Sequence, residues 1–83
     1  MDLYNYELFE KCVAQIFEMA EYNVRRNVML NNKREEIDII AEKGANKYCI
    51  EVKYALVNDH VADKISQIAL NNEMIPVNVN KFL

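Results

Sequence analysis

Two apolar stretches, Ile37–Ala41 (IDIIA) and Tyr48–Tyr54 (YCIEVKY), decide the fold of this chain. Each has the length and the apolar character of a strand. Asp38 interrupts the first stretch, and Glu51 and Lys53 interrupt the second. Burying a carboxylate without a partner is costly, so charges inside apolar strands need a reason. We therefore predict that the two strands form a site for a divalent cation.

The composition limits the chain to one small domain. It has 83 residues, of which 52% are apolar, and the domain is expected to span residues 1–83. Glycine and proline each occur once, which leaves no room for a flexible linker. A domain of this size buries only about 60–65% of its unfolded surface, so we expect a homodimer or a module of a larger protein.

Charge and cysteine content narrow the class of protein further. No apolar run reaches the roughly 18 residues of a membrane span, and the acidic N-terminus does not resemble a signal peptide. Cys12 and Cys49 lack metal-type spacing and lie in apolar patterns, which predicts two buried free thiols in the cytoplasm. The formal net charge of −3 argues against indiscriminate nucleic-acid binding, but it allows a local basic groove.

A helix is predicted from residue 6 to residue 21, with Asn5 as its N-cap. Its apolar positions recur at steps of three and four and should form the buried stripe: Phe9, Cys12, Val13, Ile16, Phe17 and Ala20. Glu10 falls at the edge of this stripe, from which its carboxylate could reach over the sheet.

Three strands should follow, at residues 22–30, 36–42 and 47–55, with the residues Tyr22, Val24, Val28 and Leu30 on one side of the first. Short turns join them, which favours an antiparallel meander. A second helix is predicted at 59–71, with the stripe Val61, Ile65, Ile68 and Ala69. A last strand is predicted at 74–79, and Pro76 indicates that it is an edge strand or that Pro76 lies at its beginning. The right-handed crossover makes that strand parallel to the third. The expected fold is α/β, in αβββαβ order, with a mixed central sheet and a helix on each face.

The charged strand residues could act together on a phosphate. Side chains alternate along a strand, so Glu51 and Lys53 should point to one face, while Asp38 lies on the neighbouring strand. Two carboxylates and the Val52 carbonyl would supply oxygen ligands for Mg²⁺. Lys53 could orient a water or stabilise charge in the transition state. The alternative is a solvated polar face with a cross-strand ion pair between Lys53 and Asp38.

These residues resemble the PD-(D/E)XK nuclease superfamily, and within it the restriction-endonuclease-like group of Mrr-type enzymes and archaeal Holliday-junction resolvases. The resemblance rests on Phe9-Glu10, Tyr22-Asn23-Val24, Glu36–Ala41 and Ile50–Lys53, and it runs from about residue 6 to residue 79. It covers the minimal core of that superfamily, without specificity loops or additional helices.

The resemblance implies a metal-dependent hydrolase that cleaves phosphodiester bonds. Asp38 and Glu51 would then ligate Mg²⁺, with Mn²⁺ as a substitute, and Lys53 would be the catalytic lysine. Glu10 would be the helix acid that assists the metal or its waters. Gln67 or Lys64 could be the extra polar residue that some members place near the site, although both also suit a solvated helix surface.

The leading hypothesis is therefore a small Mg²⁺-dependent endodeoxyribonuclease that acts as a homodimer. Its one basic cluster, a candidate contact for the DNA backbone, comprises Arg25, Arg26, Lys33 and Arg34. Charged hairpins are often only solvated, so this contact has a plain alternative. A different class of function also remains open, namely a catalytically silent nuclease-fold module used for oligomerisation or protein binding.

Overall fold

A computed structural model describes residues 3–30, 35–53 and 59–80, and the side chains of residues 6–30, 35–53 and 64–79. The elements are α1 (Leu3–Met19), β1 (Asn23–Leu30), β2 (Glu35–Lys43), β3 (Asn46–Lys53), α2 (Asp59–Asn71) and β4 (Ile75–Asn80). This is the predicted αβββαβ order. None of the described helices is long and apolar enough to cross a membrane.

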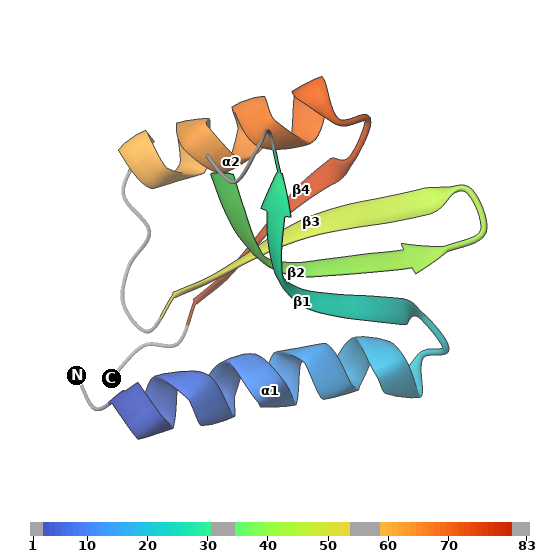
Figure 1. The fold of residues 1–83 in the computed structure, drawn as a ribbon, viewed down its shortest axis with the longest axis vertical. Helices are drawn as coiled ribbons and strands as arrows, with labels where there is room; N and C mark the ends of the chain where they lie inside the picture. The colour runs from blue at the N-terminus through green and yellow to red at the C-terminus, as the bar shows by residue number, and fades with distance from the viewer. Residues whose placement is uncertain (1–2, 31–34, 54–58, 81–83) are drawn as a thin grey trace.

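The four strands form one mixed sheet in the order β1-β2-β3-β4. β1, β2 and β3 pair antiparallel, because the connections between them are short, and β4 returns through α2 to lie parallel to β3. Figure 1 shows α1 against one face of the sheet and α2 against the other. The predicted α/β architecture, with Pro76 on an edge strand, is confirmed.

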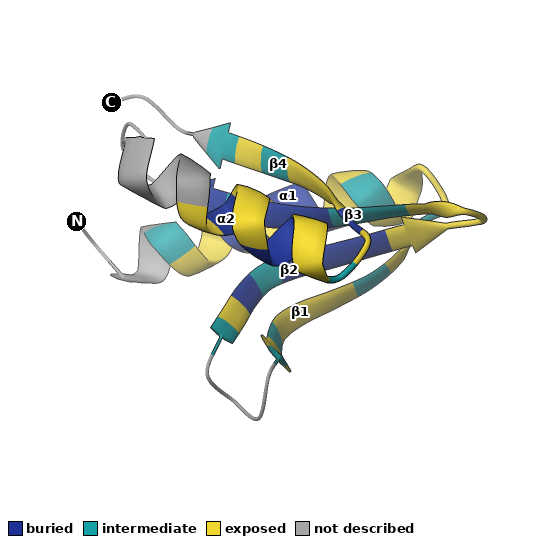
Figure 2. Ribbon diagram, turned by 90° about the horizontal axis from the view of Figure 1, so that it is seen from above, coloured by how far each residue is buried: buried dark blue, intermediate teal, exposed yellow. Residues whose placement is uncertain are grey.

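Two apolar clusters fill the layers on either side of the sheet. The α2 cluster consists of the buried residues Ile37, Ile40, Cys49, Ile65, Ile68, Ala69 and Met74. The α1 cluster consists of the buried residues Val13, Ala14, Ile39, Ala41, Ile50 and Val52. Figure 2 shows that burial is concentrated in the middle of β2 and β3, the two central strands. The predicted stripe of α2 is buried at Ile65, Ile68 and Ala69, while the side chain of Val61 lies outside the described residues.

The buried face of α1 agrees with the predicted stripe at Val13, which is buried, and at Phe9 and Phe17, which pack against the core, but it differs at other positions. Cys12, Ile16 and Ala20 are exposed, whereas Glu10 and Ala14 are buried. Apolar residues surround most of this helix, so periodicity alone leaves its rotation open. The small Ala14 side chain allows a close approach to the sheet, and an ion pair compensates the burial of Glu10. The prediction that Cys12 is a buried thiol was wrong, and Cys49 is buried as expected.

Both ends of α1 also differ from the sequence-based prediction. The helix begins at Leu3, so Asn5 lies inside it rather than at its N-cap. It ends at Met19, and Glu21 adopts a positive φ of 68° that closes the last turn, with the Tyr22 amide donating to the Phe17 carbonyl at 3.0 Å. No glycine marks this end, which explains why the predicted helix continued to residue 21. Glu73, at φ 56°, closes α2 in the same way.

β1 changes faces in its middle, contrary to the single apolar face predicted for it. Tyr22 and Val24 pack against the α1 cluster, whereas Val28 and Leu30 pack against the α2 cluster. The change occurs at Asn27, which has a positive φ of 52°, a conformation that asparagine tolerates better than most residues. The far end of the β1–β2 hairpin therefore bends towards α2, as Figure 1 shows.

Candidate active site

The bend opens the sheet at Asp38. Asn27 and Asp38 stand opposite each other on β1 and β2, but the pairing skips this position. On the other side of β2, pairing with β3 ends at Ile39 and Ile50. Beyond this point the Asp38 side chain links the two strands, because its Oδ2 accepts a hydrogen bond from the Val52 amide at 2.8 Å. This bond fixes the Asp38 side chain at the point where the two central strands separate.

Glu51 lies beside Asp38 from the neighbouring strand, as the alternation of side chains predicted. Burial raises the pKa of the Glu51 carboxyl above its ordinary value, and the nearby charge of Asp38 raises it further. A hydrogen bond between the two carboxyl groups acts in the same direction. Glu51 therefore holds its proton more tightly than an ordinary glutamate does.

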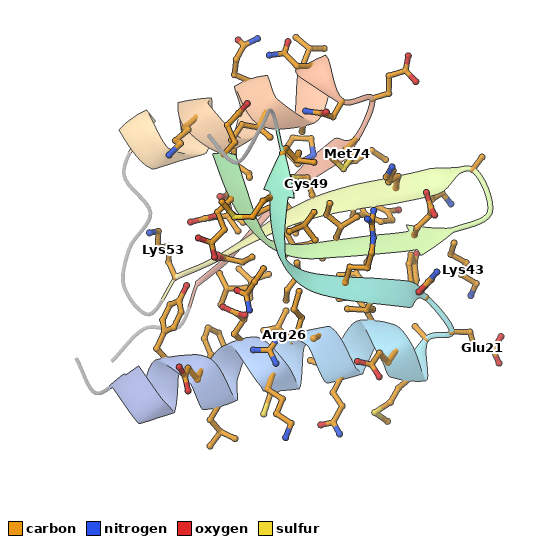
Figure 3. All side chains as sticks on the ribbon, viewed as in Figure 1. Glu21, Arg26, Lys43, Cys49, Lys53 and Met74 are labelled. Atoms are coloured by element: carbon orange, nitrogen blue, oxygen red, sulfur yellow. The ribbon has the colours of Figure 1, made fainter. Side chains whose placement is uncertain are left out.

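Lys53 places a positive charge beside this pair. Its Nζ lies 3.5 Å from Oε1 of Glu51 and lowers the pKa of that carboxyl, in opposition to burial. The ion pair joins two residues on one face of β3, not Lys53 and Asp38 as in the solvated alternative. The Lys53 side chain is 40% exposed, so its ammonium group can reach solvent or a ligand (Figure 3).

Glu10 approaches the same site from α1. Glu10 is 4% exposed, and its carboxylate accepts two hydrogen bonds from Arg26, from Nη2 at 2.9 Å and from Nε at 3.3 Å. Burial raises the pKa of Glu10, while the hydrogen bond from Arg26 lowers it. Figure 3 shows Arg26 directed from β1 towards α1. Arg26, predicted as a DNA contact, therefore already forms an ion pair with Glu10 of the same chain.

The other members of the predicted basic cluster have different positions. Arg25 is exposed on β1 and free to contact a large partner. Lys33 and Arg34 lie outside the described residues. The contact of this cluster with DNA stays a prediction.

The three predicted acidic residues, Glu10, Asp38 and Glu51, all line one cavity of about 330 Å³. Its other lining residues come from both helices and from the bent hairpin: Tyr6, Asn27, Glu36, Lys64, Ile65 and Ile68. A hollow of about 400 Å³ lies next to it along α1 and shares Tyr6, Glu10 and Asn27 with it. The site is therefore an open, acidic recess in the side of the sheet.

Tyr6, Asn27 and Glu36 were missed at the level of sequence. The hydroxyl of Tyr6 donates to the Val52 carbonyl at 3.0 Å, and burial together with the surrounding carboxylates raises the Tyr6 pKa far above its ordinary value. This contact joins residues 46 positions apart, so no local pattern could reveal it. The alternation along residues 36–42 could have indicated Glu36, since it lies two positions from Asp38.

Of the two helix residues suggested as an extra polar group, only Lys64 lines the cavity. Gln67 instead donates to Asn71 at 3.2 Å on the exposed side of α2. A cation at Lys64 faces a recess with four carboxylates, those of Glu10, Glu36, Asp38 and Glu51. It therefore partly balances the negative charge of the site.

The donor atoms suit a hard divalent cation, although they do not form a complete cage. Asp38 and Glu51 offer adjacent carboxylate oxygens, which Mg²⁺ and Mn²⁺ prefer. Among the residues that the structure describes, no group of three or more aspartate, glutamate, histidine or cysteine side chains is arranged to hold a metal. The Val52 carbonyl can still accept a second partner beside Tyr6, because a carbonyl oxygen has two lone pairs.

Comparisons with known proteins reveal the fold and little else. The sequence matches no protein-family profile and no curated protein. Among solved structures, it is similar to the crystal structure of AF1548, a protein of unknown function, with a TM-score of 0.65 and 22% sequence identity. The match covers 87% of this chain and 46% of AF1548, so the chain spans about half the length of that protein. This likeness supports the α/β fold.

Proposed function

We propose that the chain is a metal-dependent endonuclease of the PD-(D/E)XK type that hydrolyses phosphodiester bonds in DNA. The observation that carries the proposal is the meeting of Asp38 and Glu51 where β2 and β3 separate, with Lys53 beside them. The αβββαβ order and the buried acid on α1 agree with the resemblance found in the sequence.

The chemistry of the donor set fits Mg²⁺ or Mn²⁺. Asp38 and Glu51 would hold the ion, with water, substrate phosphate oxygens and the Val52 carbonyl as further donors. When bound, the ion supplies Lewis-acid activation of the phosphate and of a water. Its positive charge would also relieve the repulsion that raises the pKa of Glu51. An acidic recess is otherwise a poor place for a phosphate.

The chain's own residues would position and stabilise the reacting groups. Lys53 is exposed enough to turn from Glu51 towards an attacking water or a phosphate oxygen, where its charge would be most favourable in the transition state. Glu10 would assist by accepting hydrogen bonds from waters in the recess. Arg26 holds the Glu10 carboxylate in place and favours its ionised form, in opposition to burial.

The choice of DNA as substrate and the cytoplasm as location are parts of the same proposal. A nuclease of this type needs cations for the DNA backbone; Lys64 lines the recess, and Arg25 is exposed on β1. Two copies in a homodimer would present two sites to two strands.

The test is cleavage of supercoiled plasmid and of branched DNA in Mg²⁺ or Mn²⁺. The wild type should nick or cut, and Asp38→Asn and Lys53→Ala proteins should lose that activity while remaining folded by circular dichroism. Lys47→Ala is the matched control. Lys47 is also a lysine of β3 that forms an ion pair, in its case with Glu42 of β2, and it lies away from the recess. If the wild type cleaves no DNA or RNA under any metal condition, the silent-module hypothesis replaces the proposal.

A further inference from the structure

The side of α1 that faces away from the sheet carries a second apolar stripe. We call Leu8, Cys12, Ile16 and Met19 the outer stripe. Leu8 is 46% exposed, Ile16 is 64% exposed and Met19 is 82% exposed, and Cys12 is also exposed. At about 100° per residue these four positions fall within an arc of about 80°, opposite the buried face. No other described element covers this side of α1 (Figure 1).

The outer stripe matches itself when two copies of α1 are placed antiparallel. If the helices cross near residue 14, Leu8 of one copy lies opposite Met19 of the other, and Cys12 lies opposite Ile16. Each large side chain then meets another apolar side chain, and the same contacts repeat about a two-fold axis. Scattered exposed apolar residues do not have this property, and the stripe extends from Leu8 to Met19, the last residue of α1.

The charges beside the outer stripe agree with the same arrangement. Lys11 and Glu18 are exposed and lie seven residues apart, so they occupy one flank of the stripe. In an antiparallel helix pair, residues of the same flank face each other across the interface. Crossing near residue 14 brings Lys11 of each copy opposite Glu18 of the other. Neither residue has an ion pair within the described part of the chain.

We propose that the outer stripe of α1 binds a second copy of this chain, as an antiparallel helix pair about a two-fold axis centred near residue 14. A single helix pair is a small interface, so the dimer forms in a concentration-dependent way. No residue of the outer stripe lines the cavity of the candidate active site, although Leu8 and Lys11 line the hollow next to it. This inference does not depend on the proposed activity.

The experiment is sedimentation-velocity ultracentrifugation of the chain over a wide range of concentrations. The wild type should convert from monomer to dimer as its concentration rises. Ile16→Glu should raise the dissociation constant by roughly tenfold or more, because it places a charge in the apolar contact. Leu70→Glu is the matched control, since Leu70 is a 73% exposed apolar residue on the other helix, and its dissociation constant should equal that of the wild type.

A charge exchange tests the register of the pair. Lys11→Glu and Glu18→Lys should each weaken the dimer by roughly three- to tenfold, and the double variant should restore it. Circular dichroism of every variant excludes loss of folding as the cause. A wild type that is monomeric at every concentration overturns the proposal. A dimer that responds to Leu70→Glu as strongly as to Ile16→Glu, or a double variant without recovery, overturns it as well.

Discussion

Removing the guanidinium of Arg26 should destabilise the protein, and the loss should grow with pH. In Arg26→Ala, the buried Glu10 carboxylate loses both of its hydrogen bonds from Arg26. Breaking a fully buried pair costs about 3–5 kcal/mol, but the Arg26 side chain is 35% exposed, so solvent already screens part of the interaction. We therefore expect a loss of about 2 kcal/mol at about pH 8.

The pH dependence follows from the raised pKa of Glu10. Burial makes the folded state bind a proton at Glu10 more tightly than the unfolded state does, so stability falls as pH rises from the ordinary pKa through the folded one. Arg26 opposes this effect, and without it the pKa of Glu10 rises further. At about pH 5 the variant can protonate Glu10 and avoid a buried charge, so the loss should be clearly smaller there.

Urea unfolding at both pH values is the assay. With a slope of about 1 kcal/mol per molar urea for a chain of this size, the midpoint should fall by about 2 M at the higher pH. Arg25→Ala, an exposed neighbour on the same strand, should change stability by less than about 0.5 kcal/mol. The double variant Arg26→Ala/Glu10→Gln should recover much of the loss. Equal midpoints for Arg26→Ala and Arg25→Ala, or a loss independent of pH, would refute the reasoning.

Three further predictions concern packing and local geometry. Cys12 should react quickly with a thiol reagent, whereas Cys49, buried with its pKa raised to about 11, should react only as the protein unfolds; a single fast phase for both thiols contradicts this. In urea unfolding at a concentration that keeps the chain monomeric, Ile50→Ala should destabilise the protein by about 2–5 kcal/mol and Ile16→Ala by less than about 0.5 kcal/mol; similar losses would show that the assigned core is wrong. Glu21→Gly should raise stability by about 0.5–1 kcal/mol, because glycine adopts the positive φ of this position without strain; a lower thermal midpoint would count against the helix end described above.

The features that could be predicted from the sequence are those set by short-range patterns. The turn at Gly44, whose φ is 60°, joins two strands that pair directly on either side of it. The bounds of α2 agree with the prediction residue for residue, because its apolar stripe is narrow. Alternation along β3 placed Glu51 and Lys53 together on one face, and their ion pair agrees with that.

The features that could not be predicted depend on long-range contacts. The burial of Glu10 on α1 depends on its pair with Arg26, which is 16 residues away, and apolar periodicity alone could not predict that contact. The bend of β1 at Asn27 moves Val28 and Leu30 to the face opposite Tyr22 and Val24, and the sequence gives no sign of the positive φ at Asn27. The roles of Asp38, Glu51 and Lys53 in catalysis stay predictions, since structure alone gives their positions.

The central claim is that Asp38 and Glu51 form a divalent-cation site, and Mn²⁺ titration by isothermal calorimetry tests it most directly. The account predicts saturable binding with release of protons, because Glu51 holds its proton more tightly than an ordinary glutamate. Binding should be lost in Asp38→Asn and in Glu51→Gln and kept in Glu42→Gln, a glutamate on β2 outside the recess. Absence of binding in the wild type, or equal binding in all four proteins, would contradict the account.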